Sequence, residues 1–137
     1  QVEEVLRIHT DLSREARRDQ ALAALAAVEL PDPAGVYRKY PHELSGGMLQ
    51  RVMIAAAIVS EPKLLLADEP TGALDTRSGE QVMELFAQLH SEGVTIVMIT
   101  HEPEIARHAQ RIVTIRDGRL EQGGFGECRT EQEGDAS

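Results

Sequence analysis

The sequence predicts an α/β fold in which a helical first part precedes a mostly parallel sheet. Apolar residues recur at helical spacing through most of residues 1–30. Two short, continuous apolar runs, residues 64–67 and 94–99, have the length and pattern of buried parallel strands. Between these runs, residues 82–89 again show helical spacing, so helix and strand patterns mix in the second half of the chain.

Helices are expected first. The pattern is helical over residues 2–8 and again over residues 13–30, with the first serine of the second segment a suitable N-cap. Prolines and a glycine within residues 31–35 end this pattern. A further loop at Pro41 precedes a helix that is expected to begin at Ser45.

Strands and helices mix after that point. Pro62 and Pro70 bound the apolar run 64–67 too tightly for a helix, so a buried parallel strand is expected there. The next helical segment is followed by Gly93, which lies where a C-terminal cap is expected. A second buried strand over residues 94–99 follows.

The end of the chain is expected to be less regular. A short helix after Pro103 and a strand over residues 111–115 precede an Asp117-Gly118 hairpin turn. From Gln122 onward glycine, glutamate and small polar residues dominate, which is typical of a disordered tail.

Composition excludes several classes of function. The chain has 137 residues, of which 42% are hydrophobic, enough for one core, and its formal net charge is −9. No nucleic-acid partner is expected, because binding to phosphates needs a clustered basic face. Cys128 is the only cysteine, which excludes an intramolecular disulfide and fits a reducing compartment. The longest apolar stretches fall far short of the roughly 18 to 20 residues that a membrane-spanning helix needs.

The first motif with chemical meaning is Leu44-Ser-Gly-Gly-Met-Leu-Gln-Arg51. Ser45, Gly46 and Gly47 stand at a helix start, where backbone N–H groups and the positive end of the helix dipole attract phosphate oxygens. Glycine also allows the backbone to approach a ligand closely. Taken alone, the motif fits an ordinary capped helix equally well.

Two adjacent acids follow the first expected strand. Asp68 and Glu69 lie at its carboxyl end, where open α/β sheets place their ligand sites. One carboxylate there can hold Mg²⁺, generally through water, while the next accepts a proton from an attacking water. The alternative is a strand that simply runs into an acidic turn. Asp75 follows closely, and the second strand leads to His101, whose imidazole can donate or accept a proton near neutral pH.

These motifs, in this order and spacing, resemble the nucleotide-binding subunits of ABC transporters, in which a signature motif, a Walker B motif, a D-loop and a switch histidine follow one another. The resemblance spans residues 40–121 and implies an incomplete P-loop NTPase (ABC ATPase) domain. Residues 1–60 would form a helical subdomain portion that ends in the signature helix, and residues 61–121 the core from Walker B to the switch histidine. Residues 122–137 would form the tail.

The resemblance implies that ATP is bound between two subunits arranged head to tail. Ser45, Gly46 and Gly47 would contact the γ-phosphate of an ATP that the opposing subunit holds, and Gln50 would complete this nucleotide-binding set. A second nucleotide-binding subunit, identical or different, is therefore an expected partner.

The resemblance also implies the roles of the acids and of the histidine. Asp68 matches the acid that coordinates Mg²⁺, and Glu69 matches the catalytic base. Asp75 resembles the D-loop acid that communicates across the dimer, and His101 resembles the switch histidine that senses the γ-phosphate.

The implied protein is an ATPase subunit that couples hydrolysis of ATP, with Mg²⁺, to transport of a substrate. Transmembrane permease subunits would be its partners, and it would lie peripherally on the cytoplasmic face of the inner membrane. Residues 40–54 are similar to the ATPases of peptide and nickel importers. Residues 71–79, 100–103 and 115–119 are more similar to macrolide-export and lipoprotein-release ATPases.

The sequence contains no phosphate-binding loop of the form Gly-x-x-x-x-Gly-Lys-Ser/Thr, known as Walker A. Its lysines are Lys39 and Lys63, which follow Arg38 and Pro62 rather than glycine. Because the first residues lack a Met and already read as a helix, the chain is expected to be cut from a longer one. We expect a sheet without the Walker A strand, exposed apolar surface beside residues 94–99, and no ATP hydrolysis by the chain alone.

Two alternatives remain open. Soluble ABC ATPases of DNA maintenance share the signature and the paired acids, although Pro70-Thr71 after the acids and the acidic charge favour a transporter. The other alternative is a catalytically silent remnant of an ABC ATPase.

Overall fold

The order of helices and strands follows the hydrophobic pattern of the sequence, as a computed structural model that describes residues 1–121 shows. The chain divides into two compact units, residues 1–99 and a unit that begins at Thr100. The tail expected from Gln122 lies outside the described residues.

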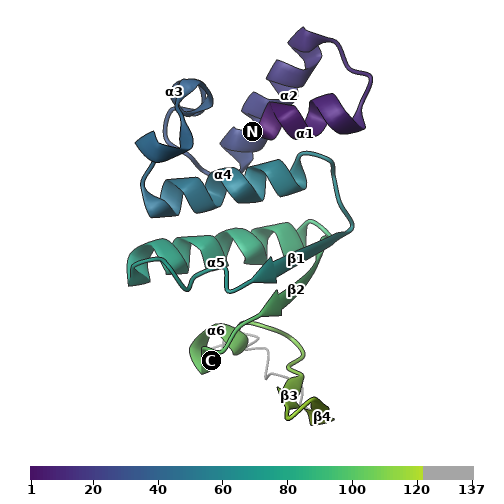
Figure 1. Ribbon diagram of the computed structural model, residues 1–137, viewed down its shortest axis with the longest axis vertical. Coiled ribbons are helices and arrows are strands. Elements are labelled where there is room, and N and C mark those ends of the chain that lie inside the picture. Colours follow the sequence, from purple (N-terminus) through teal and green to yellow (C-terminus); the bar gives the residue numbers. More distant parts are fainter. Residues whose placement is uncertain (122–137) are drawn as a thin grey trace, which may run out of the picture. The chain divides into compact units, whose positions relative to one another are not determined.

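The first unit begins with a layer of helices (Figure 1). α1 and α2 pack against each other and against α4, and α3 packs against α2. Leu6, Leu25 and Val28 are almost completely buried between them. The bounds of these helices are α1 (Val2–His9), α2 (Arg14–Ala27), α3 (Pro33–Arg38) and α4 (Gly46–Ile58).

The expected N-cap of α2 is confirmed, because the Ser13 hydroxyl accepts a hydrogen bond from the backbone N–H of Ala16 at 3.2 Å. The periodicity predicts a helix as far as Leu30, but α2 ends at Ala27. Glu29 has a φ of 55°, and this left-handed conformation cannot continue an α-helix.

The short helix α3 was not predicted, because the prolines and the glycine around it read as breakers. Proline fits the first turn of a helix, where its missing N–H group costs nothing. Asp32 supplies the cap, since its carboxylate accepts from the backbone N–H of Gly35 at 3.0 Å. A 3₁₀ turn, Pro41–Glu43, then leads to α4.

A second helix and a parallel sheet complete the first unit. In Figure 1, α5 (Thr76–Ser91) lies between α4 and the strands β1 (Leu64–Asp68) and β2 (Thr95–Ile99). The strands pair in parallel, with Leu64 opposite Thr95 and Asp68 opposite Ile99. Gly93 follows α5 with a φ of 100°, which confirms its expected place at the end of that helix.

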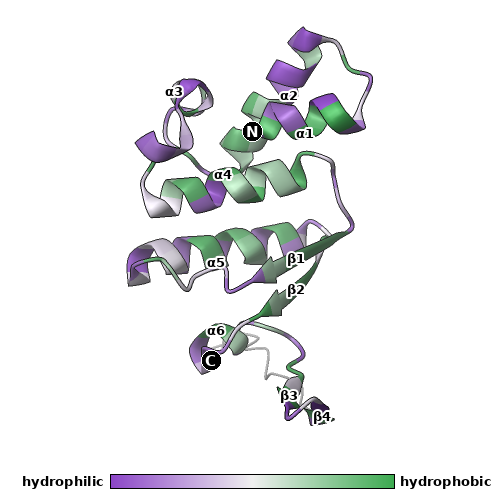
Figure 2. Ribbon diagram, in the orientation of Figure 1, coloured by the Kyte–Doolittle hydropathy of each residue, from purple (hydrophilic) through white to green (hydrophobic). Residues whose placement is uncertain are grey.

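The sheet is covered on one face only, where Leu65 is buried and Ala67, Ile96 and Met98 are half-buried, which corrects the expectation of two fully buried strands. Leu65 is 8% exposed, whereas Leu66 is 70% exposed and Ile99 61% exposed. Side chains alternate between the faces of a strand, so the exposed residues share one face. We call this the apolar sheet face, and it consists of Leu64, Leu66, Val97 and Ile99. Figure 2 shows both strands in the hydrophobic colour.

The apolar sheet face confirms the exposed surface that was expected beside residues 94–99. Within the described residues, β1 and β2 form a sheet of two strands, and β2 has no other strand beside it. Parallel strands are normally covered on both faces.

The second unit contains α6 (Pro103–Ala106) and a hairpin of β3 (Thr114–Arg116) and β4 (Arg119–Glu121). Asp117 and Gly118 form the turn, and both have positive φ, as the Asp-Gly pair predicted. The strand expected from Arg111 begins only at Thr114. None of the helices within residues 1–121 has both the length and the apolar character of a membrane span.

Candidate functional site

The phosphate-binding candidates form the start of α4. Ser45 is its N-cap, and the Ser45 hydroxyl accepts from the backbone N–H of Met48 at 3.4 Å. Gly46 and Gly47 are the first helical residues, and we call these three residues the signature turn. Its backbone N–H groups lie at the positive end of the helix dipole. Gln50 is half-buried one turn further along α4.

The signature turn lies directly against the start of α5. A Cβ atom added to Gly47 would lie only 2.9 Å from the Ser78 hydroxyl oxygen and 3.1 Å from the Ser78 Cβ. A Cβ atom added to Gly46 would lie 3.7 Å from Leu74 Cδ2. A side chain at position 47 would force the Ser78 side chain to move, so contact within the chain favours glycine there, in addition to any requirement from a ligand.

Asp75 caps the helix that the signature turn touches. One carboxylate oxygen of Asp75 accepts from the backbone N–H of Ser78 at 3.0 Å, and the other accepts from the Ser78 hydroxyl at 2.7 Å. These bonds, the backbone one first, hold the pKa of Asp75 below its ordinary value. Asp75 is therefore ionised near neutral pH.

The paired acids lie at the carboxyl end of β1, as the sequence predicted. Asp68 is the last residue of the strand and is exposed. Glu69 is half-buried, and its backbone N–H donates to the carbonyl of Ile99 at 2.8 Å. Glu69 has a φ of 45°, which is uncommon for a residue other than glycine.

A compact loop connects the acids to the start of α5. The backbone N–H of Gly72 donates to the carbonyl of Glu69 at 3.2 Å, and that of Leu74 donates to the carbonyl of Thr71 at 2.9 Å. Thr71 is buried, at 7% exposed, and it packs beside Gly79 of α5. The first unit therefore links the paired acids, Asp75 and the signature turn through short-range contacts.

His101 belongs to the second unit. It follows β2 by two residues and precedes α6, and its side chain is exposed. The neighbouring backbone N–H of Glu102 donates to the Thr100 hydroxyl at 3.1 Å. The sequence predicts that His101 lies at the same edge of the sheet as the paired acids, and this stays a prediction.

Asp68 fits a magnesium ion that is held mostly by nucleotide. Within residues 1–121, no group of three or more histidine, cysteine or acidic side chains could hold a metal ion. Mg²⁺ commonly uses only one or two protein carboxylates and takes its other ligands from phosphates and water. A single exposed carboxylate at the end of a strand suits that kind of binding.

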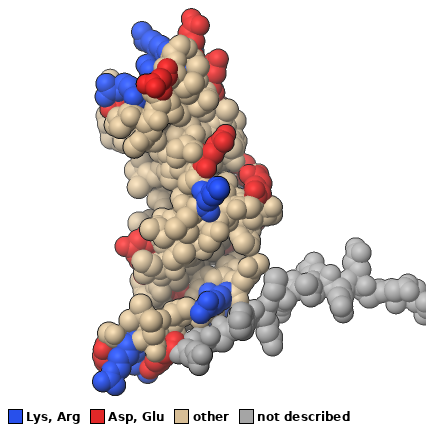
Figure 3. Space-filling model, turned by 90° about the vertical axis from the view of Figure 1, so that its right-hand side faces the viewer, with Lys and Arg blue, Asp and Glu red and all other residues tan. Residues whose placement is uncertain are grey.

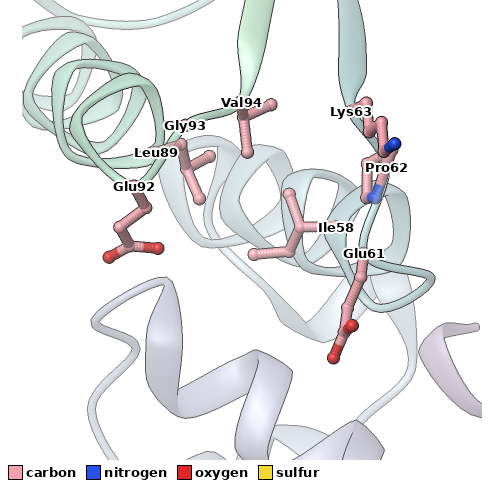
Figure 4. Close-up of a pocket in the computed structure, with 8 residues that line it drawn as sticks. All are labelled: Ile58, Glu61, Pro62, Lys63, Leu89, Glu92, Gly93 and Val94. Atoms are coloured by element: carbon pink, nitrogen blue, oxygen red, sulfur yellow. The ribbon is translucent and has the colours of Figure 1, made fainter.

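Other surfaces suit a phosphate ligand less well. On the face shown in Figure 3, lysine and arginine side chains are scattered among acidic ones. A pocket of about 350 Å³ lies near the amino ends of β1 and β2 (Figure 4). The paired acids lie at the other end of β1. Ile58, Leu89 and Val94 line it together with the carboxylates of Glu61 and Glu92. Lys63 also lines the pocket, so the lining carries two acids and one base, and its net negative charge disfavours phosphate.

Ser78 is the site residue that the sequence analysis missed. An available signal was the pattern Asp75-x-x-Ser78 at a helix start, because a cap commonly bonds to the residue three positions later. The contact of Ser78 with Gly47 joins residues that are far apart in the sequence, so a local sequence pattern cannot predict it.

Comparison with known proteins places these features in a family. The family model described as ABC transporter matches residues 1–72. The uncharacterized ABC transporter ATP-binding protein YvrO of Bacillus subtilis (strain 168) is 52% identical over 113 residues, which is 82% of this chain and 48% of that protein. The macrolide export ATP-binding/permease protein MacB of Azoarcus sp. (strain BH72) is 51% identical over 107 residues, covering 78% of this chain and 15% of that protein.

Solved structures agree with these relatives. The dimeric bacterial ABC transporter cassette MJ0796 has a TM-score of 0.77 and 39% identity, and the match covers 90% of this chain and 54% of that chain. A post-hydrolysis dimer of the same cassette, bound to ADP and Pi, has a TM-score of 0.73 and 39% identity, with 85% of this chain and 50% of that chain covered. The chain thus spans about half the length of the Bacillus ATP-binding protein and of the solved cassette.

Proposed function

The chain belongs to the ABC transporter family, and on that premise we propose that it supplies the signature turn and the catalytic acid of a transport ATPase. The observation that supports this best is the arrangement of the first unit. Adjacent acids end a parallel strand, and the loop after them leads directly to a helix start that touches the signature turn. The alternative of a DNA-maintenance ATPase finds no support among the relatives described above, whose names are those of transporter proteins.

The signature turn would act on ATP that a second subunit holds. Backbone N–H groups at a helix start bind phosphate oxygens well, and the lack of side chains at Gly46 and Gly47 permits close approach. Gln50, one turn further along α4, would complete this set. The dimeric state of the solved cassette supports an ATP site between two subunits.

Glu69 would act as the general base of hydrolysis. Its carboxylate would orient a water molecule and accept its proton as that water attacks the γ-phosphate. Asp68 would hold Mg²⁺, which neutralises charge on the phosphates when it is bound. Asp75 would communicate between the two ATP sites across the dimer interface. His101 would contact the γ-phosphate.

The partners would be a second nucleotide-binding subunit and transmembrane permease subunits, with this subunit peripheral on the cytoplasmic face of the membrane. Identity of 51% with the Azoarcus macrolide exporter supports an assembly of that type. The same similarity favours the export-type resemblance of residues 71–79 over the importer-type resemblance of residues 40–54.

The proposal is tested by replacing Glu69 with glutamine in the intact transport ATPase that contains this chain. Glu69→Gln keeps the size of the side chain but removes the proton acceptor, so phosphate release should fall by at least about 100-fold. Binding of ATP should remain, because phosphate contacts are made by other groups. The matched control is Glu84→Gln, which changes an exposed glutamate on α5. Equal phosphate release from the wild type and Glu69→Gln would refute the proposed role of this residue.

A further inference from the structure

The start of α4 packs against the start of α5, where Gly47 meets Ser78. Gly47 faces Ser78 so closely that no side chain at position 47 could fit without displacing the Ser78 hydroxyl, 2.9 Å away, or its Cβ, 3.1 Å away. The position of the signature turn is therefore defined partly by where Ser78 lies.

Ser78 is itself held on two sides. Its backbone N–H and its hydroxyl bond to different oxygens of the Asp75 carboxylate, at 3.0 Å and 2.7 Å. A charged acceptor makes such bonds stronger than neutral ones. The hydroxyl that meets the signature turn is thus fixed by Asp75, and Asp75 is fixed by Ser78 in return.

A second contact, one turn further along both helices, fixes their relative orientation. The Arg51 guanidinium donates to the Gln81 side-chain oxygen at 2.6 Å and to the backbone carbonyl of Glu29 at 2.9 Å. Arg51 lies four residues after Gly47, and Gln81 lies three residues after Ser78, so each pair shares a helix face. Two contacts along one interface oppose rotation of α4 against α5.

We infer that Ser78 is a positioning residue, whose hydroxyl holds Asp75 and the signature turn in one fixed arrangement. This inference rests on the proposed function, in which both groups act at the interface between subunits. A shift of either group alone would misplace it relative to ATP in the partner's site. Misplacement of positioning groups by about 1 Å can cost as much as 100-fold in rate.

The test compares Ser78→Ala and Ser78→Thr in the intact transport ATPase. Ser78→Ala removes the hydroxyl and keeps a good helix former, so turnover at saturating ATP should fall about tenfold. The KM for ATP should stay within about twofold, because Ser78 does not itself bind the nucleotide. Ser78→Thr keeps the hydroxyl and should recover most of the lost turnover.

The matched control is Ser91→Ala, at the other end of α5. The Ser91 hydroxyl donates to the carbonyl of Gln88 at 2.6 Å, so this change also removes one hydroxyl hydrogen bond from the same helix. Turnover of Ser91→Ala should equal that of the wild type. Unfolding temperatures of all variants show whether any loss of turnover merely follows a loss of folded protein.

Three outcomes would overturn the inference. These are wild-type turnover in Ser78→Ala, equal losses in Ser78→Ala and Ser78→Thr, and a loss that matches the fall in folded protein. Glu69→Gln, measured in the same assembly, separates this inference from the proposed function. If Glu69→Gln stops turnover while Ser78→Ala does not lower it, only the role of Ser78 fails. If Glu69→Gln has no effect, the proposed function fails.

Discussion

Glu69 continues the pairing of the parallel strands by one residue, because its backbone N–H donates to the carbonyl of Ile99 at 2.8 Å. Its φ of 45° then turns the chain away from the strand direction. The left-handed conformation costs an ordinary residue about 1 to 2 kcal/mol. The half-buried acid therefore occupies its position at some expense in stability.

Glu69→Gly should consequently separate stability from activity in the intact subunit. Glycine adopts positive φ without strain but loses more entropy on folding, by about 0.5 to 1 kcal/mol. The free energy of unfolding should stay the same or rise by about 1 kcal/mol, whereas phosphate release should fall by at least about 100-fold. Urea unfolding and phosphate release measure the two quantities.

A matched control lies just before the same strand, β1. Glu61 precedes β1 and also has a positive φ, of 52°, but it lies beside the pocket near the amino ends of the strands. Glu61→Gly should change stability as Glu69→Gly does and leave turnover unaltered. If both variants lose turnover equally, the backbone conformation matters more than the Glu69 carboxylate.

Asp68→Asn should raise the requirement for magnesium. The amide keeps the shape of the side chain but lacks its charge, so the Mg²⁺ concentration for half-maximal turnover should increase about tenfold. Titration of Mg²⁺ at fixed ATP measures this shift. Asp19→Asn, on the exposed surface of α2, should have no effect. An unchanged requirement in Asp68→Asn would exclude this carboxylate as a magnesium ligand.

The apolar sheet face should make the 137-residue chain poorly stable when it is alone. Leu66 and Ile99 are 70% and 61% exposed, so their burial contributes little to folding. Leu66→Thr should change the stability of the chain by less than about 0.5 kcal/mol, whereas Leu65→Ala should cost about 2 to 5 kcal/mol. Thermal unfolding followed by circular dichroism tests this. A cooperative transition of the unmodified chain at about 45 to 65 °C, as in complete domains, would be the opposite result.

Asp75 should contribute to stability against acid. Its pKa in the folded protein is lowered, first by the backbone N–H of Ser78 and then by the Ser78 hydroxyl. A lowered pKa means that the contribution is complete above the unfolded value of about 3.9 and is lost as the pH falls through the folded value. Ser78→Ala should move the pKa of Asp75 upward, which carbon NMR of the labelled carboxylate can measure. No movement would show that the hydroxyl bond does not act on this charge.

The sequence was sufficient for the parts of the fold and site that depend on local chemistry. Ser13 is predicted as an N-cap and Ser45 as the start of a helix, and both hydroxyls accept a capping bond. The paired acids were placed at a strand end because residues 64–67 are apolar and enclosed by prolines. The Asp117-Gly118 turn followed from the need for positive φ at both positions.

Features that depend on distant residues were not predictable in this way. A continuous apolar run predicts a strand buried on both faces, but what covers the second face is decided outside the strand. Helix α3 was missed because proline breaks a helix interior yet begins a helix readily, and only the Asp32 cap distinguishes these cases. The contact of Gly47 with Ser78 joins two helices, and the hydrophobic periodicity of either helix does not predict it.

Phosphate release by the purified 137-residue chain is the most direct test of the proposed function. The proposal is that the paired acids and the signature turn act only together with a phosphate-binding loop supplied by other polypeptide. The chain contains no Gly-x-x-x-x-Gly-Lys loop, so we expect no ATP hydrolysis above background, and Glu69→Gln should make no difference. Measurable hydrolysis that Glu69→Gln abolishes would contradict this, because these residues would then hold and cleave ATP by themselves.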